Sequence, residues 1–291
     1  MVVVPRYEDE IVDRLYKAIQ KEEESRRGPW LGRMGASAIG EECNRRIFFE
    51  LRGYLKSEIH EGRILRLFET GHRQEDRIIA DFRRAGYAIW DRDPESGKQY
   101  SYTDDTGHFV FKPDGIIKGV DGAEKTPHLL EIKTHNDKNF KALQKNGVLK
   151  AMPGHYQQMQ AGMWLSKLTR SLYVALNKND EQYYVERVPV DKVAIDKIKA
   201  KIEIQMEAML TPAGISETQS AWGCKFCPYK GGEGKPNVCA GEPAEWKNCR
   251  ACSRSQPMPN GEWLCTLFDI TLTQDAQQKG CEEYNPRSVY F

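Results

Sequence analysis

Long apolar runs are absent from the sequence. No apolar stretch among its 291 residues approaches the roughly 18 that a membrane-spanning helix needs. The first ten residues, MVVVPRYEDE, contain no apolar segment long enough for a secretory signal. We therefore expect a cytosolic protein without a membrane partner, whose thiols stay reduced in that compartment.

Net charge is also nearly absent, because 43 Lys and Arg residues face 42 Asp and Glu residues. This balance excludes a general polycation, so a nucleic-acid site must come from a local excess of basic residues. The sequence has no glycine-rich nucleotide-binding motif, which counts against a redox or electron-transfer protein. With 40% apolar and 29% charged residues, the composition is that of a globular protein.

Cysteine is scarce in most of the chain. Cys43 is the only cysteine before residue 216, and the other seven follow it. The C-terminal stretch is rich in Gly and Pro and has too few apolar residues to form a core without a bound metal. The sequence predicts two units, an α/β domain over residues 1–215 and a Cys-rich, metal-stabilised module over residues 216–291.

Hydrophobic periodicity predicts helices and strands in the first unit. The expected helices cover residues 7–27, 43–52, 63–84, 155–168 and 191–210. The expected strands cover residues 87–90, 108–112, 115–118, 128–133, 171–176 and 182–188. One helix face is expected to carry Ile64, Phe68, Gly71, Ile78, Ile79 and Phe82. Glycine inside a helix is unfavourable, so Gly71 predicts that another group approaches the helix closely.

Two carboxylates are expected to meet in a hairpin. Asp114 lies in Lys-Pro-Asp-Gly, and Glu131 lies in Leu-Leu-Glu-Ile-Lys, with a strand, a turn and a second strand between them. Adjacent carboxylates repel each other unless a cation lies between them, and oxygen ligands favour Mg²⁺ or Mn²⁺. Lys133 points to the same side of the strand as Glu131 and can orient a water or stabilise charge on a phosphate. The alternative is an ordinary turn and a surface ion pair.

Further polar residues extend this candidate site. Glu75 and His72 fall near the apolar face of the helix over 63–84, where an ionised carboxylate needs a partner. The alternative for Glu75 is a slight helix rotation that exposes it to water. In the segment His155-Tyr-Gln-Gln-Met-Gln160, the amides are candidates for binding a phosphate or a metal-bound water. Their alternative role is the polar face of an amphipathic helix.

Together these motifs resemble the PD-(D/E)XK nuclease superfamily, in its RecB-like and bacteriophage exonuclease branch. The resemblance covers most of residues 40–215 and rests on the order of the motifs around Glu75, Asp114, Glu131, Lys133 and Gln158. It implies a restriction-endonuclease-like α/β core, with an αβββαβ order and a mixed central sheet flanked by helices. In the last motif, a Tyr usually follows the Gln by four residues, but this chain has Gly162 there.

The resemblance also implies roles for these residues. Asp114, Glu131 and the carbonyl of Ile132 would hold Mg²⁺ or Mn²⁺, with Glu75 or His72 completing the site. Lys133 would act on the attacking water, and Gln158 would assist.

The cysteines form two predicted groups of four. One group comprises Cys249, Cys252, Cys265 and Cys281, with spacings typical of a structural Zn²⁺ site. The other comprises Cys43, Cys224, Cys227 and Cys239. The resemblance implies a [4Fe–4S] cluster for this second group, although its long last gap keeps Zn²⁺ open. An alternative pairing joins Cys224 and Cys227 with Cys249 and Cys252 as a zinc ribbon.

Local charge supports a nucleic-acid partner. The segment from Lys133 to Arg170 carries seven basic residues and one acid, Asp137. Arg45, Arg46 and Arg52 are candidates for extending this basic track. We expect a metal-dependent deoxyribonuclease, most simply an exonuclease, that acts on DNA. The alternatives are a non-catalytic nucleic-acid-binding protein that uses the Cys-rich module and, less favoured, an iron–sulfur electron-transfer protein. The resemblance adds a phage recombination context, a strand-annealing partner and the host cytoplasm, and leaves the oligomeric state open.

Overall fold

The computed structural model describes residues 8–27, 32–56, 59–232, 234–244 and 246–287. The helices are α1 (Glu8–Arg26), α2 (Asn44–Arg52), α3 (Gly62–Arg84), α4 (Asp137–Ala151), α5 (Pro153–Ser166), α6 (Lys192–Glu207) and α7 (Gln274–Gln278). The strands are β1 (Met34–Gly35), β2 (Ala88–Trp90), β3 (Tyr102–Thr103), β4 (Phe109–Phe111), β5 (Gly115–Lys118), β6 (His128–His135), β7 (Arg170–Asn177), β8 (Tyr183–Pro189), β9 (Ser255–Pro257), β10 (Trp263–Cys265) and β11 (Ile270–Thr271).

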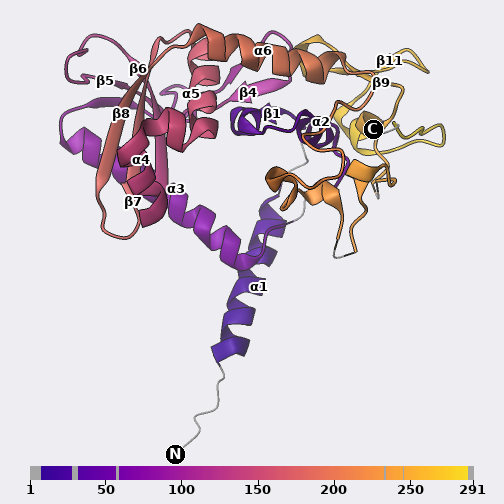
Figure 1. Ribbon diagram of the computed structural model, residues 1–291, viewed down its shortest axis with the longest axis horizontal. Coiled ribbons are helices and arrows are strands. Elements are labelled where there is room, and N and C mark those ends of the chain that lie inside the picture. Colours follow the sequence, from indigo (N-terminus) through magenta and orange to yellow (C-terminus); the bar gives the residue numbers. More distant parts are fainter. Residues whose placement is uncertain (1–7, 28–31, 57–58, 233, 245, 288–291) are drawn as a thin grey trace, which may run out of the picture.

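The central sheet has five strands in the order β2-β5-β6-β7-β8. Strands β6 and β7 run parallel, and the other neighbours run antiparallel, so the sheet is mixed. The chain between β6 and β7 forms α4 and α5, because parallel neighbours need a crossover connection. The fold is therefore a mixed α/β arrangement, as the sequence predicts (Figure 1).

Helices cover both faces of the sheet. Alternate residues of β6 separate into two buried clusters, as the two-residue period of a strand requires. Leu130 and Ile132 pack with Ile78 and Ile79 of α3 on one face. Leu129 packs with α5 residues such as Met159 on the other face. The central strands are thus buried between α3 and α5, and β6 carries the candidate site residues.

The C-terminal residues pack against α2, far from them in sequence. Tyr229 stacks on Phe49 with ring centroids 5.0 Å apart. Asn248 donates a hydrogen bond to the carbonyl of Gly53 at 2.8 Å. Figure 1 shows these orange and yellow segments beside α2. Residues from 1–215 and from 216–291 share one apolar cluster around Phe49 and Tyr229.

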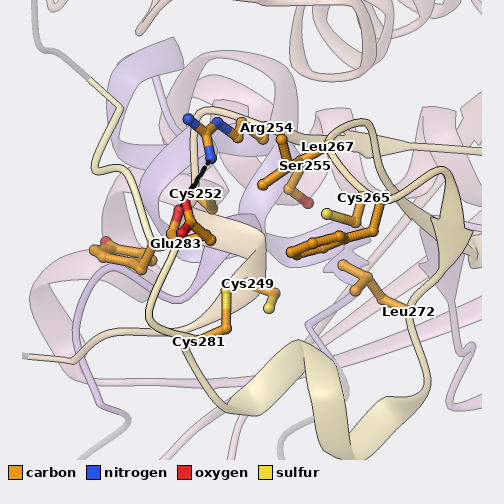
Figure 2. A pocket seen from close by; sticks show the side chains of 11 residues that line it. Cys249, Cys252, Arg254, Ser255, Cys265, Leu267, Leu272, Cys281 and Glu283 are labelled. Atoms are coloured by element: carbon orange, nitrogen blue, oxygen red, sulfur yellow. Dashed lines mark hydrogen bonds and ion pairs between the residues drawn. The ribbon is translucent and has the colours of Figure 1, made fainter.

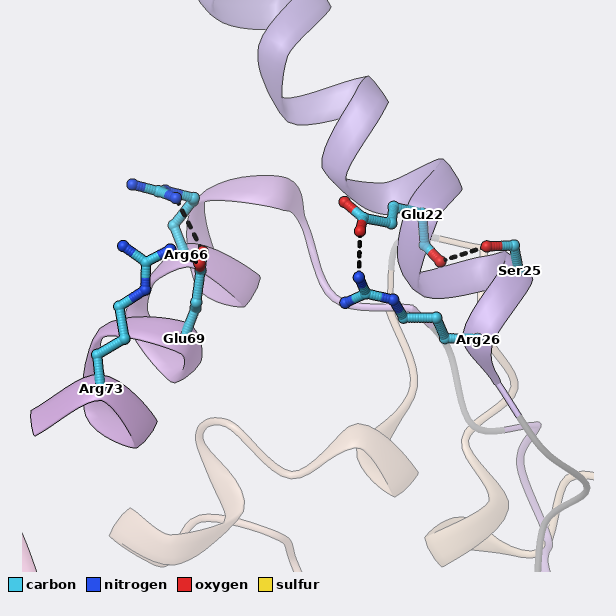
Figure 3. A network of polar contacts seen from close by, with 6 residues as sticks. All are labelled: Glu22, Ser25, Arg26, Arg66, Glu69 and Arg73. Atoms are coloured by element: carbon cyan, nitrogen blue, oxygen red, sulfur yellow. Dashed lines mark hydrogen bonds and ion pairs between the residues drawn. The ribbon is translucent and has the colours of Figure 1, made fainter. Parts of the chain in front are cut away.

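Helix α1 projects from the rest of the molecule (Figure 1). It meets α3 at Gly62, where an added Cβ would lie 2.4 Å from the carbonyl oxygen of Tyr16. Surface ion pairs line both helices near this junction, including Arg26 with Glu22 and Arg66 with Glu69 (Figure 3). Glycine at position 62 lets the two backbones approach closely.

Most predicted elements are confirmed, including β5 with the expected bounds 115–118. Helix α4 was not expected. Its sequence is rich in lysine and contains Gly147, where a φ of 71° bends the helix. The backbone N–H of Val148 donates to the Glu186 carboxylate at 2.7 Å beyond the bend. In the described part of the chain, no helix is long and apolar enough to cross a membrane.

Two expectations for α3 are wrong. No atom comes within 4 Å of a Cβ built on Gly71, so nothing approaches the helix closely at that point. Phe68 is 49% exposed instead of buried. The buried face of α3 starts later, at Ile78 and Ile79.

Candidate active site

The β5–β6 hairpin brings Asp114 beside the middle of β6. Gly115 pairs with Leu130 across the two antiparallel strands, which places Asp114 next to the following residues of β6. The backbone N–H of Ile132 donates to Oδ2 of Asp114 at 2.6 Å. Burial raises the pKa of Asp114, and Lys133 and this hydrogen bond oppose the increase. The hairpin expected from the sequence is confirmed.

Glu131 is buried, with an exposed fraction of 1%. Its charge is balanced by the Lys133 ammonium group, which forms an ion pair with Oε1. Neither carboxylate oxygen of Glu131 has a hydrogen-bond partner of normal geometry among the described residues. Burial raises the pKa of Glu131, and the nearby Asp114 raises it further. A buried carboxylate whose partner is one ammonium group keeps acceptor capacity, so it is suited to a cationic ligand.

Lys133 lies at the edge of this buried site, with its side chain 26% exposed. Burial disfavours the charged ammonium group, but Glu131 and Asp114 raise its pKa above the ordinary value. The lysine is therefore positively charged at neutral pH. It lies two residues after Glu131 on β6 and close to the carboxylates of Glu131 and Asp114.

Helix α3 supplies the third carboxylate. Glu75 and His72 line a pocket of ≈ 220 Å³ together with Asp114. Desolvation raises the pKa of Glu75, and the charge of Asp114 adds to this effect. Glu75 is half-buried and points into the pocket rather than into bulk water. The structure thus brings Glu75, His72 and Asp114 together, with Glu131 and Lys133 behind Asp114.

The glutamines of α5 are less directly connected to this site. Gln158 is half-buried, and no hydrogen bond joins it to the acidic cluster within the described residues. Gln160 has a structural role, since its Nε2 donates to the carbonyl of Pro189 at 2.9 Å and its Oε1 accepts from Asp191. Gly162 leaves room for Phe111, whose ring would lie 2.5 Å from an added Cβ. A tyrosine therefore cannot fit at position 162.

A buried polar network beside Lys133 was not predicted. His135 Nε2 and His155 Nδ1 both contact the hydroxyl oxygen of Tyr173, at 2.9 and 2.8 Å. Desolvation lowers the pKa of His155 to about 3, and the charge of Lys133 adds to this effect. Desolvation also lowers the pKa of His135, and Lys133 adds to the decrease, so the fold favours the neutral form of both imidazoles. The parallel pairing of β6 with β7 places Tyr173 opposite Glu131, a contact that a single sequence does not reveal.

The expected basic track is only partly exposed. The α4 lysines at 138, 141, 145 and 150 reach solvent. Arg45 and Arg52, in contrast, are 5% and 0% exposed, so their assignment to the track is wrong. Arg52 donates to the carbonyl of Gln205 and lies over the Phe48 ring, so it holds α2 against its neighbours.

The thiols of the C-terminal group line one pocket. Cys249, Cys252, Cys265 and Cys281 line a space of ≈ 20 Å³. Figure 2 shows these four side chains around the pocket. Burial raises the pKa of Cys249 to about 11, and the other three sulfurs of the group contribute. All four are free cysteines. The volume is sufficient for a single ion.

The second thiol group gathers in the same way despite the distance along the chain. Cys43, Cys224, Cys227 and Cys239 line another pocket of ≈ 20 Å³. Burial raises the pKa of Cys224, and Cys43 and Cys239 contribute. Arg45 points its Nη1 toward the sulfur of Cys239 at 3.8 Å. The zinc-ribbon alternative would need Cys224 and Cys227 beside Cys249 and Cys252, but these pairs line different pockets.

Among the described residues, no three side chains of His, Cys, Asp or Glu are already arranged to coordinate one metal ion. The ligand atoms at each site are nevertheless of the chemical type that metal ions bind. The carboxylate site offers oxygen atoms, two of them buried without hydrogen bonds, which suits Mg²⁺ or Mn²⁺. The two thiol pockets offer four sulfurs each, which suits Zn²⁺.

Comparisons with known proteins give structural likenesses alone. Neither a family model nor a curated protein matches the sequence. An alkaline exonuclease from Laribacter hongkongensis aligns at a TM-score of 0.44 and 18% identity, over 66% of this chain and 89% of that one. A phage-related exonuclease from Haemophilus somnus 129PT aligns at a TM-score of 0.40 and 15% identity, over 60% of this chain and 91% of that one.

Proposed function

We propose that this protein is a metal-dependent deoxyribonuclease of the PD-(D/E)XK type that hydrolyses phosphodiester bonds, most simply as an exonuclease. The observation that carries the proposal is the pair Asp114 and Glu131, held side by side by a hairpin with Lys133 on the same strand. Glu75 and Asp114 line one pocket, and the buried Glu131 lies beside Asp114 with the Lys133 ammonium group as its partner. Such a cluster is suited to a divalent cation and a phosphate.

Each residue has a defined task in this proposal. Asp114, Glu131 and the carbonyl of Ile132 would hold the cation, with Glu75 or His72 completing the set. Bound Mg²⁺ or Mn²⁺ would act as a Lewis acid toward the phosphate and lower the pKa of a water molecule. Lys133, released from its ion pair with Glu131, would orient the water or donate to a phosphate oxygen. Glu75 has a raised pKa and would accept a proton from the water through its carboxylate.

The α4 lysines support DNA as the substrate. They are exposed and follow β6 directly, so they lie on the element that leaves the site. Basic side chains bind the phosphate backbone by displacing its counterions, which makes binding dependent on salt. A strand-annealing partner in phage recombination remains a proposal from the resemblance.

The thiol pockets are proposed as structural metal sites. The four sulfurs of Cys249, Cys252, Cys265 and Cys281 would hold Zn²⁺, and those of Cys43, Cys224, Cys227 and Cys239 would hold Zn²⁺ or a [4Fe–4S] cluster, because both accept four thiolates. The pocket of Cys43 lies where the C-terminal segment meets α2, so a bound metal there would fasten this contact. The pocket of Cys249 is lined by the C-terminal segment alone, so a bound metal there would hold that segment together.

The first prediction tests the carboxylate site with end-labelled linear and circular DNA in Mg²⁺. Glu131→Gln should remove a cation ligand and abolish hydrolysis, with a loss of about 10³-fold or more. Lys133→Ala should lower hydrolysis similarly but retain binding of Mn²⁺, measured by titration calorimetry. The matched control Lys17→Ala, an exposed lysine on α1, should hydrolyse DNA at nearly the normal rate.

The outcomes separate the assignments. Full hydrolysis by Glu131→Gln would show that the catalytic site lies elsewhere. Loss of Mn²⁺ binding in Lys133→Ala would show that the lysine organises the cation site instead of acting on the water or the phosphate. DNA binding without hydrolysis by the normal protein in Mg²⁺ or Mn²⁺ would favour the non-catalytic alternative. Release of label from linear DNA, with circular DNA intact, is the result expected of an exonuclease.

A further inference from the structure

Two aromatic side chains stand out on the surface beside the Cys43 thiol pocket. Trp222 and Phe226 are each 76% exposed, the highest values among the large apolar side chains that the structure describes as exposed. The next value is 64%, for Val193. The two rings lie on one turn, with centroids 6.3 Å apart and planes at 86°. The most exposed apolar surface of the described chain is therefore a single aromatic pair.

A lysine accompanies the pair. The Nζ of Lys225 lies 5.0 Å from the centroid of the Trp222 ring and 5.4 Å from that of Phe226. No ion pair joins Lys225 to an acid within the described residues. The ammonium group thus keeps its positive charge available beside two exposed ring faces.

The fold holds these rings outward. The turn runs through the helical segment Trp222–Cys224, and Cys224 and Tyr229 point inward, with exposed fractions of 8% and 5%. Tyr229 packs on Phe49, and Cys224 lines the thiol pocket. Turning the two rings inward would expose Cys224 and Tyr229, which are buried on the same turn. The local structure therefore keeps Trp222 and Phe226 exposed.

The turn is also closely constrained. The backbone N–H of Lys225 donates to the carbonyl of Trp222 at 3.0 Å, and that of Cys224 donates to Ala221 at 2.9 Å. A Cβ on Gly223 would lie 2.9 Å from the Cδ1 of Ile215, so glycine lets the turn pack closely. A preformed pair of rings loses little conformational freedom when it binds a ligand.

We propose that Trp222, Lys225 and Phe226 form a platform for the unpaired bases of single-stranded DNA. This inference rests on the proposed function, and it specifies a substrate form for it. Bases stack on aromatic rings whatever their sequence, and a neighbouring ammonium group attracts the phosphates between them. Base pairs in a duplex are already stacked on each other, so the platform favours single strands.

A protein partner fits this surface less well. The centres of protein interfaces are enriched in Trp and Phe but depleted in Lys, whereas Lys225 lies directly over both rings here. A second copy of the chain would also place two Lys225 ammonium groups close together if it bound through the same turn. The combination of rings and positive charge therefore favours a polyanion that carries aromatic bases.

The second prediction uses the full chain in the Glu131→Gln background, so that DNA stays intact. A fluorescein-labelled oligo(dT) and a hairpin duplex of equal length are titrated by anisotropy. Trp222→Ala and Phe226→Ala should each weaken oligo(dT) binding by about 10-fold, with little change for the duplex. Trp222→Phe keeps an aromatic ring and should retain most of the affinity. The control Phe268→Ala removes another exposed ring, at 55%, and should have no effect.

A second readout follows the indole directly. Oligo(dT) should quench tryptophan fluorescence, and Trp222→Phe should remove most of the quenching while binding remains. The inference is overturned if the alanine variants bind oligo(dT) normally, or if single strands and duplex weaken together. It is also overturned if only self-association changes in sedimentation. Base binding without any hydrolysis by the normal protein would leave the platform standing and refute the nuclease, which distinguishes the two failures.

Discussion

At the scale of single residues, His155 shows how strongly surroundings shape a side chain. Its Nδ1 faces the hydroxyl of Tyr173, and the positive Lys133 and a second imidazole, His135, lie nearby. Desolvation and these charges make protonation of His155 unfavourable in the fold. In the unfolded chain the same imidazole has an ordinary pKa of about 6.5.

The third prediction follows from this difference. Because the folded pKa of His155 lies near 3, the unfolded chain binds more protons between about pH 3 and 6.5. Stability is therefore fully present above pH 6.5 and falls as the pH decreases, by up to ~1.4 kcal/mol per pH unit from this residue. Urea unfolding between pH 7.5 and 5 should show this loss, and His155→Gln should show a flatter profile. Equal slopes for both proteins would contradict the assignment.

At the scale of elements, the packing of two helical glycines differs sharply. Gly162 of α5 faces Phe111 and Leu129, which would lie 2.5 and 3.0 Å from an added Cβ. Gly71 of α3 has open space around the same position. Both residues lie in helices that border the candidate site. Comparing alanine substitutions at the two positions therefore separates the effect of packing from the effect of helix propensity.

The fourth prediction compares the two alanine variants. Gly162→Ala overpacks the contact between α5 and β4 and should lower the free energy of unfolding by about 1–3 kcal/mol. Gly71→Ala meets no neighbour and gains helix propensity, so it should raise that free energy by up to about 1 kcal/mol. Chemical denaturation of both variants measures the difference. A stabilising Gly162→Ala would mean that Phe111 moves aside easily.

Local patterns predicted the elements better than the contacts between them. The alternation in residues 128–133 and the apolar face of α3 were visible in the sequence, because burial on one side imposes a period. Helix α4 was missed because Gly147 and many lysines weaken that signal, and Glu186 stabilises the bend from a distant strand. The buried Arg52 was misjudged because its partners are a distant backbone carbonyl and a ring rather than an acid.

The candidate site could likewise be predicted only where its residues are close in sequence. Asp114, Glu131 and Lys133 are close in sequence, so one hairpin brings them together. The contact of Tyr173 with His135 and His155 depends on a parallel crossover and left no trace in local spacing. The exposure of Trp222 and Phe226 has no local sequence signature, because the Cys-rich stretch lacks hydrophobic periodicity.

At the scale of the whole molecule, the pocket of Cys43 joins α2 to residues of the C-terminal segment that are distant in sequence. Arg250 and Arg287 are each 5% exposed, and they donate to the backbone carbonyls of Leu51 and Ser255. Buried polar contacts of this kind thus hold the C-terminal segment in place beside its apolar cluster with α2.

The fifth prediction concerns the metal content of these pockets. Purified protein should contain zinc by elemental analysis, and a strong chelator should lower its melting temperature. A loss of about 3 kcal/mol corresponds to roughly 6–12 °C for a chain of this size. Cys249→Ser should reduce the zinc content and the melting temperature together, while hydrolysis by the remaining folded protein continues. Restoration by Zn²⁺ but not Mg²⁺ is the control, and a metal-free protein of equal stability would refute the zinc assignment.

The position of Cys43 has a consequence for biosynthesis. Its three companions at the pocket are made only after more than half of the chain has followed it from the ribosome. Until then, this early thiol has no neighbouring sulfur, and Phe49 has the ring of Tyr54 beside it but not that of Tyr229. The surface of α2 is thus completed late in translation, and a prematurely terminated chain would expose both groups to oxidation and aggregation.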